Sequence, residues 1–194
     1  MEQNQLYGVA LSDNLSDDEI LKHFLNAKLP RSVVADLYAY LKAVDTPIAI
    51  RSSSLLEDAH YQPFAGVYST YMVPNVKGHR ITTLMMVCEA IKAVYASVYY
   101  KDSKTYMKAT KNVINREKMA VVLQEVCGRP YGNRFYPSFS GVGRSLNFYP
   151  IGNEKPEDGV VNVALGLDKY IVDSAQTLRF SPKHPHNILQ TSAL

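Results

Sequence analysis

The sequence predicts an α+β protein, with helices in its first half and a largely antiparallel sheet in its second half. Up to residue 98, apolar residues recur mostly at helical intervals, whereas residues 119–165 contain short apolar runs separated by turn signals. The 194 residues are 46% hydrophobic and 20% charged, which is the composition of a folded protein. The apolar runs are too short for a membrane-spanning helix, and the net charge of +3 permits an anionic ligand without demanding nucleic acid.

Residues 1–46 are predicted to form a helical lead-in. Ser16 and Glu19 have the spacing of a capping box, and apolar residues then recur at helical intervals. A second amphipathic helix is predicted after Pro30. It should end before Pro47, because the residue that precedes a proline is disfavoured in the α region.

Residues 47–118 are predicted to form a lobe with a polar loop and a long helix. A short buried strand at residues 48–50 leads into a polar stretch at residues 51–62, and strand character returns at residues 66–73. An apolar stripe over residues 81–98 predicts the long helix. The lysine-rich stretch after it is typical of a solvated helix face, with an RNA-binding patch as the weaker alternative.

Residues 119–194 are predicted to form a strand-rich lobe. Residues 119–123 have the pattern of a buried strand, and residues 131–133 that of a turn. Further strands are predicted at residues 134–139, 145–149 and 160–165.

The strongest functional signal lies in residues 47–58, followed by Phe-Ala-Gly at residues 64–66. A buried strand is predicted to deliver Arg51 and three serines to the mouth of a polar loop. A guanidinium offers a planar fork of donors that suits phosphate oxygens, and serine hydroxyls and loop amides can complete a phosphate cradle. The alternative is that Arg51 pairs with Glu57 or Asp58 and fastens an ordinary loop.

Four sequence blocks occur in an order that matches one known family. They are Ile-Ala-Ile-Arg-Ser-Ser-Ser with the following Phe-Ala-Gly (residues 48–66), Met-Ala-Val-Val-Leu-Gln-Glu-Val (119–126), a segment containing Ser-Gly-Val (135–142), and residues 159–173. Together they resemble the nucleotide-binding domain of phosphoenolpyruvate synthase and pyruvate phosphate dikinase, most closely in the form found in Bacteroidetes. The resemblance implies a partial ATP-grasp fold over residues 1–194, with a phosphate-loop lobe and a hinge lobe after the helical lead-in.

The resemblance also implies roles for individual residues. Arg51 matches the catalytic arginine that binds ATP phosphates, and Ser52 and Ser53 would shape the loop around it. The adenine-binding hinge, where strand backbone groups read the edge of the base, falls at three positions: Gln124, Glu125 and Val126. For the hinge glutamate, the alternative is a solvent-facing residue at the end of a strand.

The implied activity is an ATP-dependent phosphotransfer. In the family, ATP lies between two lobes and a phosphoryl group passes to a histidine on a separate swivelling domain. That histidine then phosphorylates pyruvate to give phosphoenolpyruvate, and Mg²⁺ is required. The magnesium ligands are expected outside this chain, and pyruvate and phosphoenolpyruvate would meet other domains of the parent protein. Neither nucleic acid nor a membrane is an expected partner.

Several features leave the activity of the isolated chain open. A Gly-Gly-Lys-like segment of the family is missing before Arg51, and Asp168 and Ser174 stand where the family usually has glycines. Glycine there would permit a positive φ or close approach, and an aspartate near a triphosphate would repel it. The second hypothesis is therefore a non-catalytic nucleotide-sensing or interaction module derived from the same fold.

The length and the cysteines give two further expectations. The chain is expected to be either a segment of a longer protein or a short paralogue. Cys88 and Cys127 lie in apolar surroundings, which predicts two buried thiols in a reducing cytoplasm.

Overall fold

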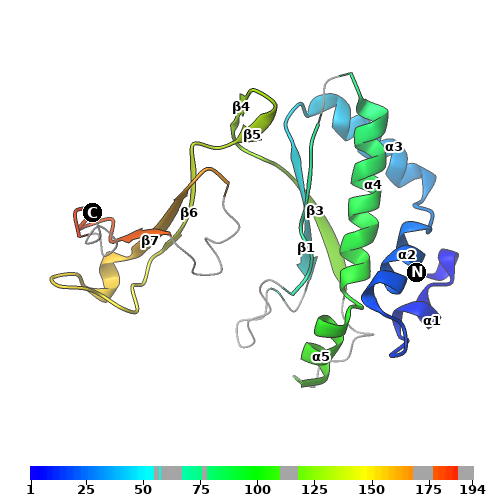
Figure 1. The fold of residues 1–194 in the computed structure, drawn as a ribbon, viewed down its shortest axis with the longest axis horizontal. Coiled ribbons are helices and arrows are strands. Elements are labelled where there is room, and N and C mark those ends of the chain that lie inside the picture. Colours follow the sequence, from blue (N-terminus) through cyan, green and yellow to red (C-terminus); the bar gives the residue numbers. More distant parts are fainter. Residues whose placement is uncertain (55–56, 58–66, 76–77, 110–117, 168–176, 188–194) are drawn as a thin grey trace. The chain divides into compact units, whose positions relative to one another are not determined.

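The computed structural model describes residues 1–54, 57, 67–75, 78–109, 118–167 and 177–187. Helices and antiparallel strands are both present, which confirms the predicted α+β class (Figure 1). The chain forms two compact units, Met1–Val126 and Cys127–Leu194. The predicted division after residue 118 differs from this boundary, because the strand that follows it pairs within the first unit.

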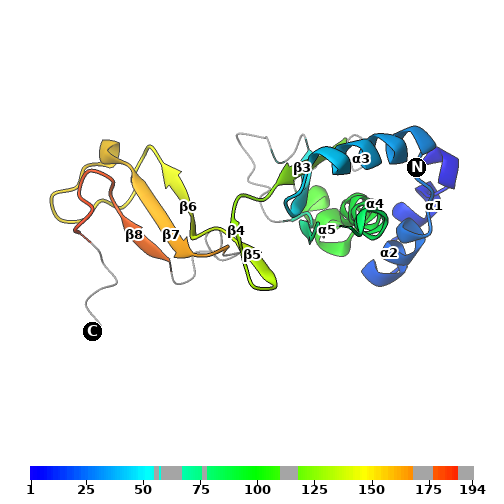
Figure 2. The same ribbon diagram turned by 90° about the horizontal axis from the view of Figure 1, so that it is seen from above.

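The first unit contains the predicted helices α2 (Asp17–Leu25), α3 (Arg31–Ala43) and α4 (Arg80–Ser97), with α5 (Lys101–Ala109) in the lysine-rich stretch. Two short helices before them were not predicted: η1 (Glu2–Asn4) and α1 (Tyr7–Ala10). The capping box is confirmed at the start of α2: the Glu19 N–H donates to Ser16 Oγ (3.3 Å) and the Ser16 N–H donates to Glu19 Oε2 (2.8 Å). Helix α3 ends before Pro47, as predicted. Helix α4 is seen nearly end-on between α2 and α3, both of which pack against it (Figure 2).

The first unit also contains a three-stranded antiparallel sheet in the order β2-β1-β3. Its strands are β1 (Ile48–Ser54), β2 (Tyr71–Val73) and β3 (Met119–Glu125). Strand β1 continues through the polar residues predicted to begin a loop, with Arg51 paired to Val122 and Ser53 to Ala120. That loop prediction is wrong at its start, because pairing with β3 satisfies the backbone groups of these residues whatever their side chains. Strand β2 is shorter than predicted, since residues 67–70 are not extended strand.

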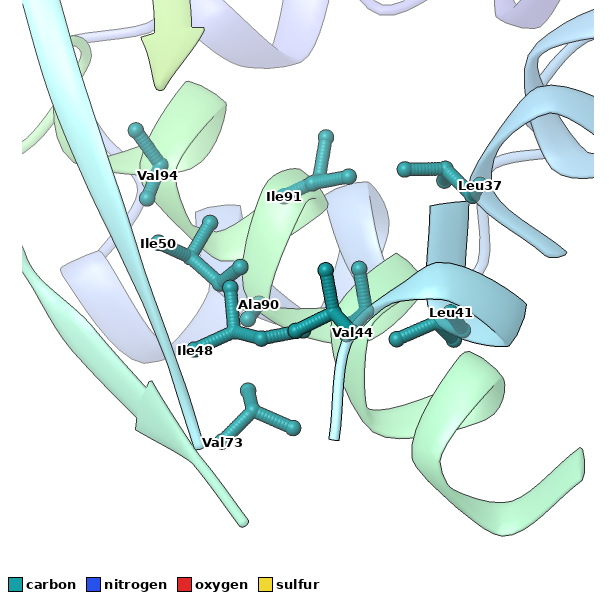
Figure 3. Close-up of a cluster of buried hydrophobic side chains, with 10 residues drawn as sticks. Leu37, Leu41, Val44, Ile48, Ile50, Val73, Ala90, Ile91 and Val94 are labelled. Carbon is teal, nitrogen blue, oxygen red and sulfur yellow. The ribbon is translucent and has the colours of Figure 1, made fainter. Parts of the chain in front are cut away.

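Helix α4 covers one face of this sheet. Ile48 and Ile50 of β1 are fully buried and point toward α4, as Figure 3 shows. They belong to one apolar cluster with residues of β2, α3 and α4: Leu37, Leu41, Val44, Val73, Val87, Ala90, Ile91 and Val94. Strand β3, predicted to be buried, is only partly so, because its alternate residues lie on the face that α4 does not cover.

The segment Arg80–Ala109 passes a length and hydropathy test for a membrane span, with a mean hydropathy of 1.5 over its best window. The short apolar runs of the sequence did not predict this. Half of that window is buried inside the protein, and α4 packs against all three strands of the sheet. These contacts are those of the core helix of a folded unit, which passes the same test.

The second unit consists mainly of short strands. They are β4 (Arg129–Tyr131), β5 (Arg134–Tyr136), β6 (Phe139–Arg144), β7 (Val160–Leu165) and β8 (Leu178–Phe180), with a short helix, η3 (Pro156–Asp158). Strands β4 and β5 form a hairpin, and β6-β7-β8 form an antiparallel sheet. The predicted turn is confirmed in the hairpin, where Gly132 has a φ of 62°. The strand predicted at residues 160–165 is confirmed as β7.

Three predictions for this part of the chain are wrong. The strand predicted at residues 134–139 is divided between β5 and β6, with Pro137, which has no N–H to donate, between them. The strand predicted at residues 145–149 is absent, because the buried Asn147 side chain accepts a hydrogen bond from the Tyr149 N–H and turns the chain. Cys127 is exposed, although it was predicted to be buried. Cys88, in the first unit, is half-buried, and this burial raises the pKa of its thiol.

Candidate functional site

The face of the β2-β1-β3 sheet turned away from α4 carries Arg51. Ala49 pairs with both Met72 and Gln124, Arg51 pairs with Val122, and Ser53 pairs with Ala120. Paired residues project to the same side of a sheet, and alternate residues along a strand share a face. We call this set the open face: Ala49, Arg51, Ser53, Met72, Ala120, Val122 and Gln124. Its larger apolar members Met72 and Val122 are 52% and 43% exposed, whereas the small Ala49 between them is buried at 5%. No helix among the described residues covers this face.

Within the described part of the chain, Arg51 and Gln124 form the one polar side-chain contact on the open face. Arg51 Nη1 donates to Gln124 Oε1 at 3.0 Å. Arg51 is exposed and forms no ion pair with any residue that the structure describes. None of the open-face side chains is acidic. The guanidinium therefore keeps its positive charge and most of its N–H groups for a ligand from outside the chain.

The serines after Arg51 divide between the two faces of the sheet. Ser52 Oγ donates to Glu57 Oε1 (2.8 Å), and the Ser54 N–H donates to Glu57 Oε2 (3.0 Å). Glu57 thus fastens the end of β1 through serines and not through Arg51, which removes one of the two alternative pairings; Asp58 lies outside the described residues. Of the three predicted phosphate-binding residues, Arg51 and Ser53 share the open face and Ser52 points away from it.

The predicted hinge lies at the end of β3. The Val126 N–H donates to the Pro47 carbonyl at 2.9 Å and extends the β1–β3 ladder. Because backbone groups alternate between the two edges of a strand, those of Gln124 also face β1, while those of Glu125 face the outer edge of β3. That edge has no partner strand in the described part of the chain. The Glu125 side chain accepts a hydrogen bond from Thr46 Oγ1 at 2.9 Å on the covered face.

The hinge carboxylate also affects a neighbouring tyrosine. Burial raises the pKa of Tyr40, and the negative charge of Glu125 raises it further. The Tyr40 hydroxyl therefore stays protonated beside the hinge at neutral pH.

The described residues do not bring together three or more histidine, cysteine or acidic side chains that could hold a metal ion. None of them is therefore assigned to magnesium. Asp168 and Ser174, which depart from the family pattern, lie outside the described residues, as does the Phe-Ala-Gly block at residues 64–66.

A cavity of about 580 Å³ lies elsewhere in the first unit, between its N-terminal segment, α2 and α4. Leu6, Phe24 and Lys92 are among the residues that line it, and none of the predicted site residues does.

The sequence predicted Arg51 as a site residue but did not predict its hydrogen bond to the Gln124 side chain. The two residues are 73 positions apart, and only the β1–β3 register makes them diagonal neighbours. The open-face positions of Ala49, Met72 and Val122 were missed for the same reason. No local pattern distinguishes the two faces here, because apolar residues occupy consecutive positions in each of the three strands.

Two comparisons with known proteins bear on this site. Residues 11–190 match the family described as pyruvate phosphate dikinase, AMP/ATP-binding domain. A phosphoenolpyruvate synthase of Aeropyrum pernix is 29% identical over 166 residues, which cover 81% of this chain. The same match covers 18% of the relative, so the chain spans a small part of the length of that protein.

Proposed function

Because this chain belongs to the AMP/ATP-binding domain family of pyruvate phosphate dikinase, we propose that it binds ATP with the phosphates on its open face. The observation that carries the proposal is the exposed Arg51 guanidinium, which has no carboxylate partner among the described residues and lies on a face without acidic side chains. We further propose that the chain serves a phosphotransferase of the phosphoenolpyruvate synthase kind. In such a protein, phosphoryl transfer through a histidine to pyruvate belongs to other domains.

In this proposal Arg51 is the catalytic residue of the chain. Its guanidinium donates to oxygens of the transferring phosphoryl group and offsets the charge that spreads over them in the transition state. Ser53 adds a hydroxyl donor from the same face. Ser52 acts indirectly, because its hydrogen bond to Glu57 fixes the end of β1.

We place the adenine-reading groups at the outer edge of β3. The N–H and C=O of Glu125 face that edge, flanked by Gln124 and Val126, and offer one donor and one acceptor to the edge of a base. Mg²⁺ would neutralise phosphate charge when bound. The described residues bring no set of carboxylates to the open face, so Arg51 and Ser53 are what this part of the chain offers to the phosphates.

Calorimetric titration of the full chain with ATP tests the proposal, with Arg51→Ala compared against Arg31→Ala. Both substitutions remove one exposed arginine, but Arg31 is the first residue of α3, on the covered side of the sheet. We expect Arg51→Ala to weaken binding about 10- to 100-fold, from the ~1.5–3 kcal/mol of a hydrogen bond to a charged group, and Arg31→Ala to leave it unchanged. Absence of binding by the wild type, or equal affinities of the two variants, would contradict the proposal.

The non-catalytic alternative rests on Asp168 and Ser174, which replace glycines of the family pattern. It makes the same prediction for ATP binding but a different one for chemistry. A longer protein that contains this chain would bind labelled ATP and form no phosphohistidine. Formation of phosphohistidine would exclude this alternative.

A further inference from the structure

We propose that Gln124 is a positioning residue for Arg51, whose side-chain carbonyl holds the guanidinium in the orientation that a nucleotide phosphate requires. The inference rests on the proposed phosphate site and deepens it. It assigns Gln124 to the phosphate side of that site and leaves the reading of the base to the backbone of Glu125.

The geometry of the sheet supports this assignment. Gln124 pairs with Ala49, and Arg51 pairs with Val122, so Gln124 and Arg51 are diagonal neighbours on the open face. The Nη1–Oε1 distance of 3.0 Å is that of a well-formed hydrogen bond. The backbone groups of Gln124 face Ala49 in the ladder. Neither its side chain nor its backbone is therefore directed to the outer edge of β3.

The contact also determines which part of Arg51 remains available. A guanidinium donates from a fixed planar fork, so holding Nη1 restricts the whole group. The edge formed by Nε and Nη2 has no partner among the described residues, and this edge can donate two parallel hydrogen bonds to a phosphate. Because Gln124 Oε1 accepts from Arg51, the Nε2 atom of the same amide group points away from the guanidinium. Its two N–H groups are neutral donors on the same face of the sheet.

The chemistry of an amide at this position is as important as its reach. A glutamate would accept the same hydrogen bond, but its negative charge would pair with Arg51 and compete with a phosphate. The nearest carboxylate in the strand, Glu125, is directed to the covered face and accepts from Thr46. Gln124 thus orients Arg51 without cancelling its charge.

Two substitutions separate orientation from charge. Gln124→Met keeps the length of the side chain and removes the strong acceptor, and Gln124→Glu keeps the acceptor and adds a charge. Gln3→Glu is the matched control, because Gln3 is exposed in η1 and undergoes the same chemical change away from the sheet. Circular dichroism and urea unfolding of each full-length variant establish that the fold is retained.

ATP affinity is then measured by calorimetry at several pH values, relative to the wild type at the same pH. We expect Gln124→Met to bind about threefold to tenfold more weakly and Gln124→Glu more than about tenfold more weakly at pH 7, with Gln3→Glu unchanged. Affinity of Gln124→Glu should recover only as the pH falls below about 4.3, the ordinary pKa of a glutamate, because pairing with Arg51 lowers the pKa of the introduced carboxyl and the protonated acid is neutral like the amide. In the Arg51→Ala background, Gln124→Met should have no further effect.

The outcomes distinguish this inference from the proposed function. If the wild type does not bind ATP, both are overturned. If the wild type binds and Arg51→Ala weakens binding, but both Gln124 variants bind within about twofold of the wild type, the positioning role alone is overturned. It is also overturned if the effects of Arg51→Ala and Gln124→Met are additive, or if Gln124→Glu does not recover at low pH.

Discussion

The first unit is stabilised mainly by apolar side chains under its sheet, whereas the described part of the second unit depends on buried polar groups. Within the residues that the structure describes, the three clusters of buried apolar side chains all lie in the first unit. Among the described residues of the second unit, the buried apolar side chains are Val160 and Ala164. Its β6–β7 pair instead leaves Phe139 and Leu165 68% and 92% exposed.

The polar groups of the second unit meet around Asn147, which is fully buried. Its Nδ2 donates to Glu154 Oε2 at 3.0 Å, and its Oδ1 accepts from Arg179 Nη2 at 2.7 Å and from the Tyr149 N–H at 3.1 Å. A second contact joins Asp158 to Lys183 at 2.9 Å.

The difference shows what each unit can leave uncovered. Because helix α4 supplies the core from one side, the first unit can expose Arg51 and Gln124 on the other side without loss of stability. In the second unit, loop geometry depends on individual hydrogen bonds. Substitutions should therefore act through lost apolar contacts in the first unit and through unpaired polar groups or titration in the second.

The largest effect is expected in the apolar core. Ile50→Ala should lower the free energy of unfolding by about 2–5 kcal/mol, because Ile50 is fully buried against α4. Val163→Ala, in the half-exposed middle strand of the second unit, should cost less than about 1 kcal/mol. Urea unfolding of both variants measures the difference. Equal losses would remove the contrast between the two units.

A somewhat smaller effect is expected at the centre of the polar network. Asn147→Ala should cost about 1–3 kcal/mol, because it leaves the buried Glu154 and the half-buried Arg179 without this partner. Hydrogen–deuterium exchange should rise over residues 147–154. Asn133→Ala, in the exposed turn of the hairpin, is the control and should stay within about 0.5 kcal/mol of the wild type. If Asn147→Ala left the free energy of unfolding unchanged, the network would not hold this loop.

A local polar contact in the first unit should contribute less. Ser16→Ala should cost about 1 kcal/mol by removing the cap of α2. Ser32→Ala, in the first turn of α3 without a recorded capping bond, should have little effect. Thermal unfolding of the two variants measures this. A loss as large as that of Ile50→Ala would contradict the dominance of apolar contacts in this unit.

The smallest effect is a pH dependence of the second unit. Hydrogen bonds from Lys183 and from the Lys155 N–H lower the pKa of Asp158, and the contact with Asp158 raises the pKa of Lys183. The Asp158 contribution is present above the ordinary aspartate pKa of about 3.9 and is lost as the pH falls through the lowered value. The Lys183 contribution is present below about 10.4 and is lost as the pH rises through the raised value.

Hydrogen–deuterium exchange of residues 155–167 and 177–184, measured from acid to alkaline pH, tests this dependence. Protection should decline at both extremes in the wild type. In Asp158→Asn, the part of this loss of protection that comes from the Asp158–Lys183 pair should disappear at both acid and alkaline pH. Identical profiles for the two proteins would show that the pair does not contribute.

Local signals in the sequence predicted the elements whose causes are local. The capping box of Ser16 and Glu19 predicted the start of α2, apolar spacing predicted α4, and the glycine at residue 132 predicted the turn that joins β4 to β5, although β4 itself was not predicted. The strand predicted at residues 145–149 failed because the Asn147 side chain accepts from the Tyr149 N–H and turns the chain. That side chain is itself held by Glu154 and by Arg179, the second of which is 32 residues away. The strand character of the polar residues after Ile50 likewise depends on β3.

The candidate site divides in the same way. The family motif predicted Arg51, and no local pattern could place Gln124 beside it. That placement depends on the register between β1 and β3, in which Arg51 meets Val122. Ser52 lies on the face opposite to Arg51 because β1 continues as a strand through both residues, where a loop was predicted. A shift of one residue in that register would exchange the two faces of β3 relative to Arg51.

The central claim is that nucleotide phosphates lie on the open face. Titration of the ¹⁵N-labelled full chain with ATP, followed residue by residue by NMR, tests it most directly. The account predicts that the largest changes in amide chemical shift belong to Arg51, Ser53, Val122 and Gln124, and to Glu125 at the edge of β3. Shifts concentrated around the cavity lined by Leu6, Phe24 and Lys92, or no shifts at millimolar ATP, would contradict it.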